Sequence, residues 1–142
     1  MNALPISASE FKQRLAQLCL TSNSPDLPRR QRDRQIVLKS IALRLSKDRT
    51  YTEQEINAAL AGWISEVACS FEVDHVALRR SLIDEKYLDR SEDGKLYRLS
   101  IPSCADWFAP EVDEIDPAIV IQAALAEAKA KRARHAQSEP RA

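Results

Sequence analysis

The stretch Asp74–Leu99, DHVALRRSLIDEKYLDRSEDGKLYRL, contains two different hydrophobic periods. Its first part predicts a helix that begins behind Asp74, a residue type that caps helix N-termini well. Its second part has two short alternating stretches around Asp93-Gly94, where glycine supplies the positive φ of a tight turn. We therefore predict a helix followed by a β-hairpin over Leu88–Leu99. The residues expected on the buried face of the helix are Val76, Leu78, Leu82 and Ile83.

Two further helices are expected before this stretch. Pro28 opens the first, and Thr52 with Glu55 forms a capping box at the start of the second. Their apolar stripes recur at helical spacing. The order of three helices and a hairpin is that of a winged helix-turn-helix, which we place over residues 27–101. The two stripes consist of Ile36, Val37, Ile41 and Leu45, and of Ile56, Leu60, Trp63, Ile64 and Val67.

Extra helices are expected on both sides of this domain, and the fold class is mainly α. Residues 1–26 contain an amphipathic helix that Ser7 caps, followed by a linker. Residues 102–142 contain an acidic linker, an Ala-rich helix that begins at Asp116-Pro117, and a disordered basic tail from Gln137. The apolar stripe of the N-terminal helix consists of Phe11, Leu15, Leu18 and Cys19.

Length and composition are typical of one globular domain with short extensions. The chain has 142 residues, of which 44% are hydrophobic and 30% are charged. Its 21 basic residues balance 21 acidic ones, so any attraction to nucleic acid must be local. No apolar run approaches the roughly 20 residues of a membrane span, and the first residues are unlike an export signal. We expect a cytoplasmic protein without membrane attachment.

No catalytic constellation is evident. Asp74 and His75 are neighbours and so point in different directions on a helix, and His135 lies in a basic tail without further metal ligands. With only 2 glycines, the chain has no phosphate-cradling loop. The cysteines are three widely spaced residues among apolar neighbours, as in a protein from a reducing compartment. We expect no enzymatic activity, cofactor or metal. The cysteines are Cys19, Cys69 and Cys104.

Charge is segregated along the chain. Between Leu27 and Thr50 lie eight basic and two acidic residues, whereas Tyr51 to His75 carries five acidic residues and no basic one. Four arginines crowd the expected start of a helix, where the helix dipole disfavours positive charge. One interpretation is that these arginines bind DNA phosphate, which would offset the repulsion. The alternative is that they form a solvated face and pair with carboxylates of the acidic second helix.

The third helix and the hairpin supply further candidate contacts. Arg80 and Ser81 face outward at 100° per residue, as do Asp84 and Glu85, which would oppose phosphate. Arg79 falls inside the apolar arc and is expected to be structural. The hairpin cations are accompanied by acidic neighbours. The predicted nucleic-acid-binding residues are Arg29, Arg30, Arg32, Arg34, Arg80, Ser81, Arg90 and Lys95.

Four blocks of the chain carry a family resemblance. They are Leu27–Arg34, Tyr51–Asn57, Leu78–Asp84 and Leu88–Arg98. In this order they resemble a small bacterial domain of unknown function that occurs alone or appended to ArsR-type transcriptional regulators. The resemblance covers about half of the chain. It implies a winged-helix-like fold and a link to transcription, with no established reaction.

The terminal helices offer a second kind of function. Exposed apolar stripes seldom stay unpaired, so we expect either a homodimer or a protein partner there, with bracing of the domain as the alternative. Two functions therefore remain: a transcription-associated protein that binds double-stranded DNA, and a protein-interaction module of winged-helix shape. In the C-terminal helix, Ala123, Ala124, Ala126 and Ala130 permit close helix approach, while Ile119, Val120 and Leu125 need burial.

Overall fold

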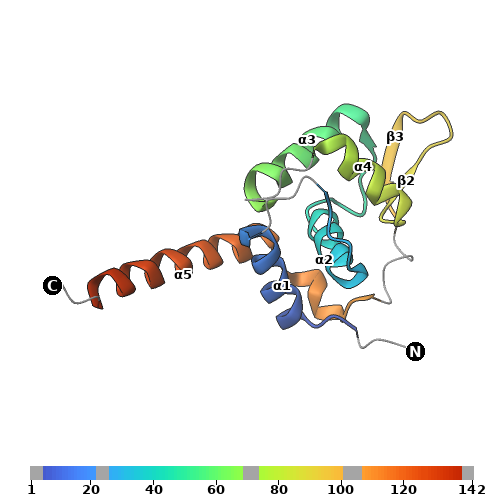
Figure 1. The fold of residues 1–142 in the computed structure, drawn as a ribbon. Coiled ribbons are helices and arrows are strands. Elements are labelled where there is room, and N and C mark those ends of the chain that lie inside the picture. Colours follow the sequence, from blue (N-terminus) through green and yellow to red (C-terminus); the bar gives the residue numbers. More distant parts are fainter. Residues whose placement is uncertain (1–4, 22–25, 69–73, 101–106, 139–142) are drawn as a thin grey trace.

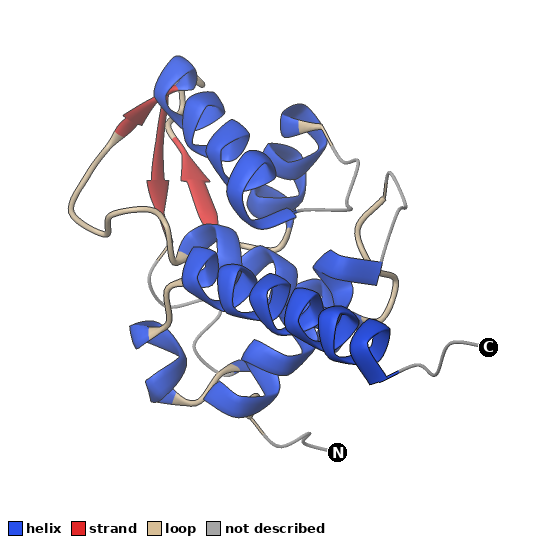
Figure 2. Cartoon of the chain, turned by 90° about the vertical axis from the view of Figure 1, so that its left-hand side faces the viewer, coloured by secondary structure: helices blue, strands red, loops and turns tan. Residues whose placement is uncertain are grey.

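The computed structural model describes residues 5–21, 26–68, 74–100 and 107–138 and is mainly helical, with one small antiparallel sheet (Figures 1 and 2). This confirms the predicted fold class at that level. None of the described helices is long and apolar enough to cross a membrane. In chain order the elements are α1 (Ala8–Thr21), α2 (Gln31–Ala42), β1 (Tyr51–Thr52), α3 (Glu53–Trp63), the π-helical turn η1 (Ile64–Ala68), α4 (His75–Asp84), β2 (Leu88–Arg90), β3 (Leu96–Leu99), the 3-10 helix η3 (Pro110–Glu114) and α5 (Pro117–Ser138).

The sheet has the strand order β1-β3-β2. Strand β3 is central: Tyr97 lies opposite Tyr51 of β1 on one side and opposite Arg90 of β2 on the other. Strand β1 was not predicted from the sequence, because a two-residue strand is too short to show alternation. Strand β1 exists only because β3 supplies its hydrogen-bond partner.

The predicted hairpin is confirmed, and Gly94 does adopt a positive φ of 73°. The turn is closed by Ser91, whose N–H donates to the carbonyl of Leu96 at 2.9 Å and whose Oγ accepts from the N–H of Leu96 at 3.0 Å. The Ser91 hydroxyl donates to Asp93, and this hydrogen bond lowers the pKa of the Asp93 carboxyl. These local bonds define the loop between β2 and β3.

Most predicted helix starts are also confirmed. Thr52 and Glu55 form the full capping box of α3, and Asp74 accepts the N–H of Ala77 at 2.8 Å at the start of α4. Ser7 and Asp116 accept N–H groups in the first turns of α1 and α5. Helix α2 is different: it begins at Gln31, three residues after Pro28, and ends at Ala42, before Leu45.

One hydrophobic core joins α1 to the remaining helices. Phe11, Leu15 and Cys19 of α1 are fully buried in the same cluster as Ile36 and Trp63. The apolar stripe of α1 is therefore not available to a protein partner, contrary to the prediction. Val76, which was expected in the core, is 47% exposed. Cys69 and Cys104 lie outside the described residues.

The C-terminal segment returns to the N-terminal one. Ile6 forms a parallel bridge with Phe108, and the ring of Phe108 packs edge-on against Phe11 with the centroids 6.1 Å apart. Helix α5 contacts α1 and η1 near its start and then projects away from the other helices (Figure 1). It continues to Ser138, and residues 139–142 of the predicted disordered tail lie outside the described residues.

The buried hydrogen bond between Trp63 and Ser40 generates a stability prediction. The indole Nε1 donates to the Ser40 Oγ at 2.9 Å, and both side chains are fully buried. Ser40→Ala leaves the indole N–H without its acceptor, so we expect a loss of about 1–3 kcal/mol in the free energy of unfolding, measured by urea titration.

Trp63→Phe combined with Ser40→Ala provides the matched test. With both partners absent, the second substitution is expected to cost less than it does alone, as a double-mutant cycle measures. Ser9→Ala on the exposed side of α1 serves as the neutral control. Strictly additive effects of the two core substitutions would contradict the interpretation.

Candidate nucleic-acid interface

Two of the arginines predicted to bind nucleic acid, Arg32 and Arg34, form ion pairs within the protein. Arg32 donates through Nε and Nη2 to both carboxylate oxygens of Glu10 in α1, at 2.5 and 2.6 Å. Arg34 donates through Nε to Glu85 Oε2 at 3.1 Å. The crowding of positive charge at the start of α2 is thus offset by carboxylates from two other segments. The charges of Arg32 and Arg34 are therefore neutralised within the protein.

A second ion pair joins α1 and α2, and here α1 supplies the arginine and α2 the carboxylate. Arg14 of α1 donates through Nε and Nη2 to both oxygens of Asp33 in the first turn of α2, at 3.1 and 2.8 Å. Asp33 is buried. Because each helix contributes one arginine and one carboxylate, the pair of bridges fixes α1 along α2.

Glu85 is turned toward α2. Its carboxylate accepts hydrogen bonds from Arg34, from the Gln35 amide at 3.0 Å and from the Gln31 amide at 3.3 Å. The Gln35 side-chain oxygen in turn accepts a hydrogen bond from the hydroxyl of the buried Tyr87. From helical spacing, Glu85 was expected on the outward face of α4 as a charge that opposes phosphate. That expectation was wrong, because its carboxylate is paired with Arg34.

The end of α4 has a tight geometry that connects it to the hairpin. The N–H of Tyr87 donates to the carbonyl of Leu82 at 2.8 Å, and that of Lys86 donates to Ile83 at 3.1 Å. This is the Schellman pattern, and Lys86 holds the left-handed position at φ 70° that glycine usually occupies. Strand β2 begins two residues later at Leu88. The helix and the strand are therefore joined by a short turn of defined shape.

A depression of about 320 Å³ lies between α4 and the hairpin. Arg80 lines it from α4, and Arg90 lines it from β2. Both side chains belong to exposed residues, and among the described residues neither makes an ion pair. Two of the predicted site residues are thus brought together. The remaining lining residues are Val76, Arg79, Ile83, Asp84 and Tyr97.

Arg79 has the structural role that its place in the apolar arc predicts. Its Nη1 donates to Asn57 at 2.6 Å and lies 3.3 Å from Glu53, both on α3. Its guanidinium carbon is 5.8 Å from the centre of the Tyr97 ring. Arg79 therefore joins α4 to α3 and β3, and its side chain lines the depression.

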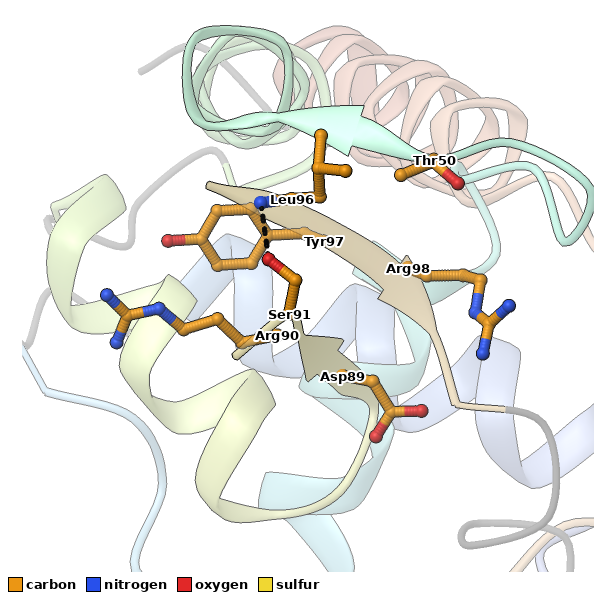
Figure 3. Close-up of a pocket in the computed structure, with 7 residues that line it drawn as sticks. All are labelled: Thr50, Asp89, Arg90, Ser91, Leu96, Tyr97 and Arg98. Carbon is orange, nitrogen blue, oxygen red and sulfur yellow. Dashed lines mark hydrogen bonds between the residues drawn. The ribbon is translucent and has the colours of Figure 1, made fainter. Parts of the chain in front are cut away.

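The hairpin presents a second, smaller depression of about 220 Å³, shown in Figure 3. There Arg90 and Arg98 extend from neighbouring strands in opposite directions, and Asp89 lies opposite Arg98 in the strand register. A methyl group on Gly94 would come within 2.5 Å of Arg90 Nη2. Gly94 therefore provides the turn and leaves space for the Arg90 guanidinium, a second role that the sequence did not indicate.

The other predicted residues are dispersed. Arg29 and Arg30 are exposed just before α2, where Gln31 contacts Glu85 at the C-terminal end of α4. Lys95 is exposed in the hairpin turn. Ser81 is half-buried and does not belong to the lining of the depression, as far as the chain is described.

Metal ligands do not gather in the described part of the chain, where no three His, Cys, Asp or Glu residues lie close enough to hold an ion. His75 is exposed at the first position of α4. The expected lack of catalytic activity, cofactor and metal stays a prediction.

Fold and site together describe a small helical domain whose three-stranded sheet carries an arginine-lined depression. The chain belongs to the family described as an uncharacterized protein conserved in bacteria (DUF2087), whose model matches residues 25–99. The match runs from before α2 to the end of β3, and α1 and α5 lie outside it. No curated protein and no solved structure matched the chain.

The ion pair between Arg32 and Glu10 predicts a specific dependence of stability on pH. The hydrogen bond from Arg32 holds the pKa of the Glu10 carboxyl below its ordinary value of 4.5. A carboxyl with a lowered folded-state pKa contributes stability above the unfolded-state pKa, and this contribution is lost as the pH falls through the folded-state pKa. We expect Glu10→Gln to lower the melting temperature at pH 7 and to approach wild type near pH 3, about a unit below ordinary carboxyl pKa values.

Thermal unfolding followed by circular dichroism between these two pH values measures the effect. Glu92→Gln, in the exposed hairpin loop, removes the same kind of charge and is expected to follow the wild-type curve. Parallel curves for wild type and Glu10→Gln would show that the pair makes no pH-dependent contribution.

Proposed function

We propose that residues 27–100 form a winged helix-turn-helix that binds double-stranded DNA, with α4 as the recognition helix and the β2–β3 hairpin as the wing. The chain order α2, β1, α3, α4, β2, β3 and the central place of β3 in the sheet support this fold. The proposal includes the role in transcription that the resemblance to a domain of ArsR-type regulators implies. Helix α3 and α4 form the helix pair, and Arg79 links them.

The observation that carries the proposal is the meeting of Arg80 and Arg90 at one depression. Arginine side chains that lack a carboxylate partner bind phosphate through two parallel N–H groups. Glu85, the acidic residue that would have opposed phosphate here, is turned toward α2 and paired with Arg34. The cations of α4 and of the wing therefore face an acidic ligand with only Asp84 against them in the lining.

The first turn of α4 has the character of a base-contacting surface. His75, Val76 and Ala77 are exposed there, and Val76 borders the same depression as Arg80. An apolar side chain contacts the methyl group of thymine, and an arginine pairs with guanine in the major groove. A helix of 10 residues is about 15 Å long, which suits one crossing of that groove.

The outer contacts of the proposed complex come from exposed cations of neighbouring segments. Lys95 and Arg98 of the hairpin and Arg29 and Arg30 before α2 are all exposed. In the proposed complex the first two contact phosphates beside the wing, and the other two contact phosphates beyond the C-terminal end of α4. A protein-interaction function without DNA is the alternative, favoured by the balance of 21 basic and 21 acidic residues.

Fluorescence anisotropy with a labelled duplex of random sequence tests the proposal. We expect binding at low salt with a dissociation constant of about 1–100 µM, weakening steeply between about 50 and 200 mM salt. Arg80→Gln and Arg90→Gln are each expected to weaken binding and to reduce the slope of log affinity against log salt by about 1.

Arg32→Gln is the matched control, because it removes the same charge from an arginine that Glu10 already neutralises. It is expected to leave the affinity unchanged once circular dichroism has shown that the variant is folded. Absence of salt-sensitive binding by the wild type at about 50 mM salt would reject the DNA function and leave the interaction module. Equal losses for Arg32→Gln and Arg80→Gln would reject the depression as the contact site.

A further inference from the structure

A groove of about 530 Å³ lies at the base of α5, where α5 meets α1 and η3. Its floor is apolar: Ile115, Ile119 and Ala123 line it, and the Ile119 side chain belongs to a residue that is 60% exposed. Carboxylates of Glu111 and Glu114 border the groove, together with the helix-capping Asp116, and Lys12 lies on the α1 side. The groove thus suits a segment that has small apolar side chains and basic residues.

The C-terminal half of α5 is basic and could occupy such a groove. Lys129, Lys131 and Arg132 are exposed there, and within the described chain none of them makes an ion pair, whereas Arg134 pairs with Glu127 of the same helix. The helix has 22 residues and is about 33 Å long, and its second half projects away from the other helices (Figure 1). This half therefore cannot reach its own groove.

One face of α5, which includes the groove residues Ile119 and Ala123, has a regular pattern. Every member is a small residue except the first, and the spacing alternates between four and three, which is the seam period of two helices wound together. Small side chains along such a seam let two helix axes approach closely. The residues are Ile119, Ala123, Ala126, Ala130 and Ala133.

We propose that the groove holds the C-terminal half of α5 from a second copy of the chain, packed antiparallel, so that each copy fills the groove of the other. The antiparallel direction brings the basic C-terminal half of one copy, with Lys129, Lys131 and Arg132, to the groove that Glu111 and Glu114 border in its partner. The same direction opposes the two helix dipoles favourably. The contact is isologous and closes as a dimer, as two-fold symmetry requires. It does not depend on the DNA proposal, because the residues of the two surfaces are different.

Charge reversal in two separate chains gives a sharp test. Glu111→Lys/Glu114→Lys makes the groove basic, and Lys131→Glu/Arg132→Glu makes the projecting half acidic. Sedimentation equilibrium of the full-length wild type is expected to show a dimer with a dissociation constant of about 1–100 µM, since the interface is small. Each charge-reversed chain alone is expected to dimerise at least about tenfold more weakly.

An equimolar mixture of the two charge-reversed chains is expected to recover the dimer, because each then offers what the other lacks. This recovery separates loss of the interface from loss of folding. Glu92→Lys/Asp48→Lys makes the same charge change outside the groove and is expected to dimerise like wild type. Ala126→Glu, on the exposed middle of α5, is expected to abolish the dimer without altering η3.

A wild type that stays monomeric up to about 0.5 mM overturns the proposal and leaves the groove to a basic helix of another protein. A mixture of folded charge-reversed chains that stays monomeric overturns it as well. Raising the salt concentration to about 1 M is expected to weaken the wild-type dimer, because the ion pairs are at the surface. Wild-type affinity that is independent of salt would contradict the proposed charge pairing.

Discussion

The carboxylate of Glu85 is the contact on which the geometry of the candidate site depends. It accepts hydrogen bonds from Gln31, Arg34 and Gln35 of α2 at the point where α4 ends. Directly after it, Lys86 turns the chain in the left-handed conformation, and Tyr87 enters the core. Because β2 follows at once, the same contacts that hold α4 against α2 also set the direction of the hairpin. Arg80 and Arg90 meet at one depression for this reason.

Ion pairing also redistributes the charge that the chain displays. In the sequence the basic residues cluster around α2, yet Arg32 and Arg34 are paired there with Glu10 and Glu85. Surface ion pairs contribute little individually, but these join α1 and the end of α4 to α2 and neutralise two cations. The cations left at the candidate site belong to α4 and the hairpin, which are close to neutral along the sequence. The number of basic residues in a stretch of sequence therefore does not give the charge that the same stretch presents at the surface.

The family match and the core have different extents. The match covers residues 25–99, whereas the core also includes Phe11 and Leu15 of α1 and Phe108 after the sheet. Helix α1 completes the hydrophobic core of the matched region, so it is a structural part of this chain. Helix α5 is different, since it contacts α1 and η1 near its start and then projects away from the other helices (Figure 1). Of the two terminal helices, α5 and not α1 therefore has a surface that a partner could contact.

Local chemistry in the sequence determined the helices, most of their first residues and the hairpin. The capping of α3 by Thr52 and the positive φ of Gly94 involve groups within a few residues of one another, so the pattern of side chains is sufficient. Tertiary structure alone decided the strand β1, the exposure of Val76 and the partners of the arginines. Arg34 and Glu85 are 51 residues apart, and their pairing follows from how α2 and α4 pack, which no local pattern records. The arginines at the candidate site are defined by this packing, because it determines which cations are neutralised and which remain exposed.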